Sequence, residues 1–353
     1  MSLEEQLTQQ AGAITDPEIG RSLADLRMIN SATVDGSTAK FSITLPTHAY
    51  PNPERIASRI REVVIKDNIT DVAVEFDHKV KGKNTGGSIG LNVKNIIAVG
   101  SGKGGVGKST VAACLASGLK SFGAKVGLMD ADVYGPSIPH MMGAEGKPAA
   151  VEKEGGAGQP INRIEPVEVD GLKLMSMGFF VEPGQAVVWR GPMLHKALTQ
   201  FLKDTDWGEL DYLIIDLPPG TGDVSLTLAQ LVGLAGAVIV CTPQQVALLD
   251  AVKAIDMYKK VNVPVLGIVE NMAGEVFGRG GAKAKAEELN VPFLGEIPIE
   301  ATIRVKGDEG QVPALFSDDH PAREALLSVC QTTAMQVAKE LMETPQAPTL
   351  EIL

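Results

Sequence analysis

The stretch at residues 96–110 restricts the fold more than any other part of the chain. It reads IIAVGSGKGGVGKST, and residues 111–122 continue it with a helix-compatible segment. The spacing from Gly102 to Gly107-Lys108-Ser109 matches G-x-x-x-x-G-K-[ST], the P-loop that surrounds a phosphate with backbone N–H groups. An apolar strand, the full motif and a helix occur in the required order. This order favours a phosphate site over the simpler interpretation as a glycine-rich turn.

The residue types of this loop suit an anion. Glycines let the backbone curl, and the following helix presents its positive end to the same anion. Lys108 can reach the outer phosphates, and the hydroxyl of Ser109 can ligate Mg²⁺.

Composition narrows the class of protein. The chain has 353 residues, room for two or three domains, and a net charge of −11 that argues against a general nucleic-acid surface. It has neither an apolar run of membrane-spanning length nor a signal-peptide pattern, so we expect a cytoplasmic protein. The three cysteines are Cys114, Cys241 and Cys330. They lie far apart and form no C-x-x-C pair, which argues against a disulfide framework.

Periodicity predicts two domains. Residues 1–78 have the order helix, two strands, helix, strand, which predicts a small α+β domain, and residues 79–91 resemble a flexible linker. In residues 92–345 buried strands alternate with helices, which predicts an α/β fold with a mainly parallel sheet covered by helices on both faces. We expect strands at residues 96–99, 126–129, 172–175, 212–215, 237–240, 265–269 and 293–297, and a tail at 346–353.

Carboxylates follow two of these strands. Asp130 and Asp132 come after residues 126–129, and we expect them to have different tasks, one anchoring the loop or the metal shell and the other orienting a water toward the terminal phosphate. The alternative is a pair of turn or helix-capping residues. Asp216 ends an apolar run in the Walker B form and can hold Mg²⁺. Residues 218–222 can shift when the terminal phosphate leaves, and Asp223 suits a helix N-cap.

Asn271 ends another strand. Its amide can pair with an adenine edge, or it can be a turn residue, and the pattern leaves both possibilities open.

Lys103 carries a resemblance. The order Gly-Lys-Gly-Gly-Val-Gly-Lys-Ser-Thr resembles the deviant Walker A motif of MinD/ParA-type ATPases, in which the early lysine reaches the partner's nucleotide across a dimer. Such a cation would stabilise charge in the transition state. The alternative is a solvated loop lysine.

Longer strings resemble the Mrp/ApbC branch of iron–sulfur cluster carriers. They lie at residues 130–137, 188–193, 216–223, 240–244 and 269–272, and residues 16–20 and 25–26 resemble the branch's iron–sulfur-assembly domain. The resemblance implies ATP hydrolysis and a homodimer whose two subunits are bridged by a [4Fe-4S] cluster. It also implies that this cluster is transferred to apo-proteins or assembly factors. It implies water activation at Asp132, Mg²⁺ at Ser109 and Asp216, and adenine contact at Asn271. It also implies ATP contact at Gly102, Lys103, Gly104, Gly105, Val106, Gly107, Lys108, Ser109 and Thr110.

The chain departs from the branch in its thiols. The C-x-x-C that usually follows the Glu-Asn-Met segment is missing, and residues 47–51 lack the usual cysteine of the small domain. His48 in that turn is interpreted as a solvated loop histidine, since one ligand does not make a soft metal site. Cys241, at a strand end, is the only cysteine that we consider as a cluster ligand.

The sequence therefore predicts a homodimeric ATPase that carries iron–sulfur clusters, with slow hydrolysis coupled to cargo. One alternative is an ATP-gated adaptor or regulator that carries no cluster. Another is a positioning ATPase on DNA or membrane, which is disfavoured by the negative charge and by a C-terminal helix, residues 320–342, with Lys339 as its only cation after Arg323.

Overall fold

The structure, a computed structural model, describes residues 2–66, 69–82, 91–154, 160–180, 191–220 and 222–343. It divides into two compact units. The first consists of the residues up to Lys81 together with those from Ala334 onward, and the second runs from Gly82 to Thr333. Most of the expected linker and the whole expected tail at 346–353 lie outside the described residues.

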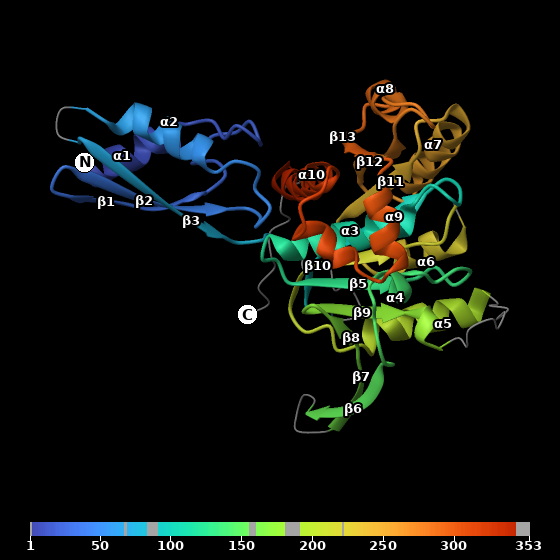
Figure 1. Cartoon of the computed structure of the whole chain (residues 1–353). Helices are drawn as coiled ribbons and strands as arrows, with labels where there is room; N and C mark the ends of the chain where they lie inside the picture. Colours follow the sequence, from blue (N-terminus) through green and yellow to red (C-terminus); the bar gives the residue numbers. More distant parts are fainter. Residues whose placement is uncertain are drawn as a thin grey trace. The chain divides into compact units, whose positions relative to one another are not determined.

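The first unit is a three-stranded sheet packed against helices (Figure 1). Its elements are α1 (Leu3–Gly12), β1 (Ile29–Asp35), β2 (Thr38–Leu45), α2 (Glu54–Val64) and β3 (Asp71–His78). β1 and β2 form the antiparallel hairpin, and β3 pairs parallel to β2. α2 buries Ile56, Ile60 and Val64 on one face, as its spacing predicts. The predicted α+β organisation is confirmed.

The second unit is built on an eight-stranded sheet with the order β13-β12-β11-β4-β10-β5-β9-β8 (Figure 1). Its strands are β4 (Val93–Ser101), β5 (Val126–Asp130), β8 (Val167–Val169), β9 (Leu172–Ser176), β10 (Leu210–Asp216), β11 (Gly236–Cys241), β12 (Val265–Ala273) and β13 (Phe293–Pro298). The pairings are parallel except for the edge pair β8–β9. Each of the seven expected strands is present, and the predicted α/β class is confirmed.

Helices cover both faces of this sheet. They are α3 (Lys108–Ser121), α4 (Ile138–Met141), α5 (Gly191–Lys203), α6 (Asp223–Leu231), α7 (Gln245–Lys260), α8 (Gly281–Glu288), α9 (Ala301–Asp308) and α10 (Arg323–Glu343), with 3-10 turns at Met177–Phe180 and Val312–Phe316. One core cluster joins α5, α6, α7 and α8 to alternate residues of the strands, such as Ile96 and Ala98 of β4. α3 packs on the same strands but contributes nothing to that cluster, so it covers the other face.

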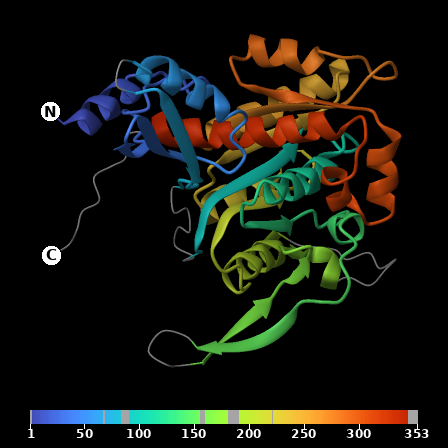
Figure 2. The ribbon, with the colours of Figure 1, turned by 60° about the vertical axis from the view of Figure 1, so that its left-hand side comes forward.

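A hairpin that the sequence did not reveal extends away from the sheet (Figures 1 and 2). It consists of β6 (Ala149–Glu154) and β7 (Pro160–Glu165). Its base is fixed by backbone bonds between Ile164 and the segment after α5, with Ile164 N–H donating to the carbonyl of Asp204 at 2.7 Å. Its side chains are mostly exposed, so it lacks the buried alternation by which the other strands were found.

Two features differ from the sequence-based expectations. Residues from Ala334 onward group with the first unit, whereas the sequence places residues up to 345 with the P-loop domain; Met335, 3% exposed, packs in the core of the first unit. Gly222 caps α6, and Asp223 is its first residue rather than its N-cap. None of the described helices is both long and apolar enough to cross a membrane.

Candidate functional site

The P-loop connects the central strand β4 to α3. Gly107 caps α3, and Lys108 is its first residue, so the positive end of the helix meets the loop. A cavity of about 280 Å³ opens here. It is lined by Ser101, Lys103, Gly104, Gly105, Gly107, Lys108, Ser109, Thr110, Asp132, Ser137, Met141 and Pro219.

Two motif glycines are required by the packing. A Cβ at Gly102 would lie 2.1 Å from the backbone carbonyl carbon of Asp250 in α7, so the loop backbone approaches this helix too closely for any side chain. Gly107 has φ +79°, and its Cβ would lie 2.2 Å from Nδ2 of Asn271. Gly102 and Val106 are not among the residues that line the cavity.

Lys108 is the centre of a buried charge cluster. Its side chain is 7% exposed, and its Nζ lies 2.6 Å from Oδ1 of Asp216 and 3.5 Å from Oδ2 of Asp132. Nζ also donates to the hydroxyl of Ser109 at 3.2 Å. The structure thus brings together the lysine, the hydroxyl and the two carboxylates that the sequence had selected from three separate segments.

Asp216 is fully buried at the end of β10. Burial raises the pKa of Asp216, and the ammonium of Lys108 opposes that shift. Its second oxygen, Oδ2, is buried and makes no hydrogen bond of ordinary geometry to a described group, although the nearby hydroxyl of Ser109 lowers the pKa of Asp216. An unsatisfied buried carboxylate oxygen is unusual and indicates a site for a ligand.

Asp130 and Asp132 have separate tasks. Asp130 is fully buried; it accepts hydrogen bonds from the backbone N–H of Asp132 at 3.1 Å and from the hydroxyl of Ser176 at 2.9 Å. Burial and the nearby carboxylate of Asp216 raise the pKa of Asp130 to about 7. Asp130 thus anchors the loop that carries Asp132, and Asp132 lines the cavity and faces Lys108.

A second cavity, of about 470 Å³, adjoins the first and shares Thr110, Ser137 and Met141 with it. Its other lining residues are His140, Asn271, Met272, Pro298, Ile299, Glu300, Ile303, Arg304, Gly307 and Asp308. Asn271 lies within β12, so its interpretation as a turn residue is wrong. The sequence missed the residues at 137–141 and 298–308. The position of residues 298–300 directly after a parallel strand could have indicated them.

The cysteines do not form a ligand set. Cys241 is 1% exposed, and burial together with Glu270 raises the pKa of its thiol to about 12. Burial also raises the pKa values of Cys114 and Cys330. The segment after Asn271 is a short loop closed by two backbone bonds between Gly274 and Gly278. In the ranges that the structure describes, no three His, Cys, Asp or Glu side chains form a metal-ion group.

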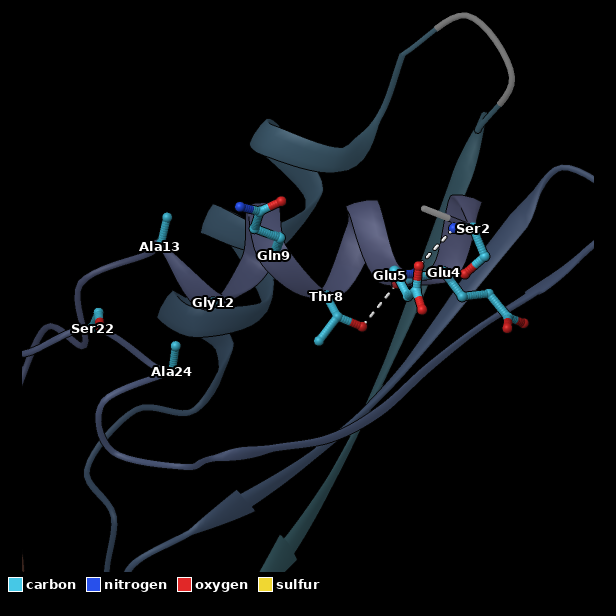
Figure 3. Close-up of a pocket in the computed structure, with 9 residues that line it drawn as sticks. All are labelled: Ser2, Glu4, Glu5, Thr8, Gln9, Gly12, Ala13, Ser22 and Ala24. Carbon is cyan, nitrogen blue, oxygen red and sulfur yellow. Dashed lines mark hydrogen bonds between the residues drawn. The ribbon is translucent and has the colours of Figure 1, made fainter.

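The first unit uses its polar residues locally. His48 is half-buried rather than solvated, and its ring stacks on that of His78 with centroids 5.2 Å apart. A broad depression of about 720 Å³ lies along α1 (Figure 3). There Ser2 and Glu5 satisfy each other in a capping box, and Thr8 donates to the carbonyl of Glu4. The residues that line this depression belong to the first unit, and none of them is part of the P-loop.

Comparison with known proteins agrees with this geometry. The family model described as NUBPL iron-transfer P-loop NTPase matches residues 92–334. The chain belongs to this family. A second model, described as iron-sulfur cluster assembly protein, matches residues 9–76. Membership places this NTPase among nucleotide-hydrolysing proteins in general.

Relatives of this NTPase cover its length. An iron-sulfur cluster carrier protein of Deinococcus radiodurans is 44% identical over 98% of this chain and 99% of its own. An iron-sulfur cluster carrier protein of Synechocystis is also 44% identical, over 92% of this chain and 95% of its own. The structure of a nucleotide-binding protein of Archaeoglobus fulgidus in complex with ADP is 40% identical, covers 66% of this chain and 91% of its own, and has a TM-score of 0.55. The cell division ATPase MinD of Pyrococcus furiosus, 21% identical with a TM-score of 0.51, shares the fold.

Proposed function

We propose that this NTPase binds and hydrolyses ATP at the P-loop cavity and acts, as a homodimer, as a carrier of iron–sulfur clusters to apo-proteins. The observation that carries the proposal is the buried cluster of Lys108, Asp132 and Asp216 beside the N-terminus of α3. The whole-length relatives named iron-sulfur cluster carrier proteins give the cargo.

Lys108 and the start of α3 bind the phosphates. The ammonium of Lys108 now neutralises Asp216 and Asp132. Phosphate oxygens entering the cavity compete for this ammonium and for the backbone N–H groups of the first helical turn. The lysine then stabilises the negative charge that develops on the transferred phosphoryl group.

The residues present fit Mg²⁺. Asp216 offers a buried oxygen without a well-formed hydrogen bond to any described residue, and the hydroxyl of Ser109 lies beside the same lysine. Such oxygen donors suit a hard cation, which would supply charge neutralisation at the phosphates. Ser109 and Asp216 would hold it.

Asp132 orients the attacking water. Its carboxylate lines the cavity, and Asp130 fixes its backbone through the 3.1 Å hydrogen bond. A positioned carboxylate that accepts the proton of a nucleophile is a recurrent part of phosphoryl-transfer sites. Lys103 lines the same cavity and would act from a second copy on the nucleotide of the first.

Coupling and cargo are tested separately. Slow hydrolysis would drive rearrangement of the dimer and the loading or release of a cluster. Phosphate release by the purified protein, with and without an apo-protein acceptor, measures both the basal rate and the coupling. A basal rate equal to that of Lys108→Ala would contradict the ATPase assignment.

The three cysteines of the chain are not an evident source of ligands for the proposed cluster. All three cysteines are buried, and burial raises the pKa of each thiol, which disfavours the thiolate form that ligates iron. Anaerobic reconstitution with iron and sulfide, followed by UV–visible absorption, tests carriage directly. We expect Cys241→Ser to retain the absorption of the wild type. The absence of any stable cluster in the wild type would overturn carriage and favour the cluster-free adaptor, which the relatives do not support.

A further inference from the structure

Asn271 holds the phosphate loop as well as lining the neighbouring cavity. It is 6% exposed, and its Nδ2 donates to the carbonyl oxygen of Val106 at 2.9 Å. A carbonyl only accepts hydrogen bonds, so the amide nitrogen must face it. The amide oxygen is then the acceptor that Asn271 can offer to a ligand.

The bond to Val106 also fixes a donor of the loop. The C=O of Val106 and the N–H of Gly107 belong to one planar trans peptide and point in opposite directions. Holding the carbonyl toward Asn271 therefore sets the direction of the Gly107 N–H. Gly107 lines the phosphate cavity, where such N–H groups meet an anion.

The fit between Asn271 and the loop leaves no spare room. A Cβ at Gly107 would lie 2.2 Å from Nδ2 of Asn271 and 3.4 Å from Cε of Met272. Met272 itself has φ +57°, which is uncommon for a bulky residue and requires support from its surroundings. The side chain of Asn271 therefore packs directly against the loop at Gly107, where only glycine fits.

The two cavities share Thr110, Ser137 and Met141, and Asn271 connects them in a second way. Asn271 lines the larger one, and through Val106 it orients the loop that lines the smaller one. We infer that Asn271 is a positioning residue that couples binding in the nucleoside cavity to the geometry of the phosphate loop. This inference rests on the proposed ATP binding, with phosphates in the smaller cavity and the nucleoside in the larger.

A ligand that lacks the adenine base can distinguish positioning of the loop by Asn271 from direct contact between Asn271 and the adenine. We would measure the affinities of ATP and of inorganic tripolyphosphate by calorimetry, with Mg²⁺ present, for the wild type, Asn271→Ala and Asn271→Asp. Asn271→Asp keeps the size of the side chain and removes the N–H that faces Val106. Ile299→Ala is the matched control, because Ile299 lines only the larger of these two cavities and is 46% exposed.

We expect both Asn271 variants to bind tripolyphosphate about five- to tenfold more weakly, the usual effect of losing one hydrogen bond, and to bind ATP more weakly as well. Ile299→Ala should weaken ATP alone. Asn271→Asp also adds a negative charge that repels phosphate, so Asn271→Ala decides the outcome. Unchanged tripolyphosphate affinity in Asn271→Ala, with ATP affinity reduced, would overturn the inference and leave ATP binding intact. A wild type that binds neither ligand would overturn both. Thermal unfolding of each variant without ligand shows that the comparison is made on folded protein.

Discussion

Two fully buried aspartates, one in each unit, differ in what their surroundings leave open. Asp16 in the first unit accepts bonds from the backbone N–H groups of Glu18 and Ile19 on one oxygen, and from the hydroxyl of Tyr50 at 2.8 Å on the other. Asp216 in the second unit pairs with Lys108 through one oxygen, and its other oxygen has no described hydrogen-bond partner. Two equally buried aspartates therefore have different roles. A carboxylate whose oxygens are all hydrogen-bonded within the protein supports the fold, whereas one with an unbonded oxygen indicates a binding or catalytic site.

The strongest test of this contrast is Lys108→Ala. It removes the cation that faces both carboxylates, so we expect ATP hydrolysis to fall by about 10³-fold, since charge-stabilising groups supply the main part of phosphoryl-transfer catalysis. Steady-state phosphate release measures the effect. Lys196→Ala, an exposed lysine of α5, is the control and should retain the wild-type rate.

Asp132→Asn tests the division of work between the paired carboxylates. The change removes the proton acceptor but keeps the side chain's size, so we expect kcat to fall by about 10²-fold while the KM for ATP changes little. The same phosphate-release assay over a range of ATP concentrations separates the two constants. A rise in KM with an unchanged kcat would make Asp132 a binding residue instead.

Lys103→Ala tests whether the open site is completed by a second copy. We expect hydrolysis to fall by about tenfold to 10²-fold while nucleotide still binds. Mixing this variant with Lys108→Ala should restore part of the rate, because the Lys108→Ala subunit still offers its Lys103 to an intact site. A mixture as inactive as its components would show that Lys103 acts within its own subunit.

Asp16→Ala tests the closed side of the comparison. It leaves the Tyr50 hydroxyl and two backbone N–H groups without their acceptor, so we expect the first unit to lose about 2–3 kcal/mol of stability. Urea unfolding followed by circular dichroism measures this loss. ATP hydrolysis at low denaturant should be unchanged, and a large fall in that rate would break the contrast between the two aspartates.

The smallest effect concerns the histidine pair. Burial, with the ring of His48 adding to it, lowers the pKa of His78 below its usual value of 6.5. A lowered pKa in the folded state means that the contribution to stability is present above pH 6.5 and is lost as the pH falls through the folded value. NMR titration should give a lowered pKa for His78, and His48→Ala should raise it. An unshifted value would place His78 in ordinary solvent.

The sequence revealed the parts of the site that obey a fixed local spacing. Lys108 and Ser109 stand at fixed positions in the P-loop motif, and Asp216 and Asn271 end apolar runs that could only be buried strands. Their meeting followed from topology, because parallel strands end at one edge of the sheet. The pairing of Lys108 with Asp216 is a consequence of that rule.

What the sequence did not reveal depends on contacts between distant segments. The cavity wall at residues 298–308 has no motif, and Ile299 and Arg304 gain meaning only beside Asn271. The bond from Asn271 to Val106 joins residues 165 positions apart, and nothing in either local pattern predicts it. The burial of Cys241 likewise depends on contacts that its local sequence pattern does not predict.

The membership of α10 has a consequence for the order in which the chain becomes complete. The helix begins in the second unit, but Met335 belongs to the core of the first, and Arg21 donates to the carbonyl oxygen of Met342 at 3.0 Å. A ribosome therefore releases the first unit's sheet long before it releases the helix that finishes its core. The unit that is synthesised first is completed last, and a protein cut between the two units would separate that sheet from its own final helix.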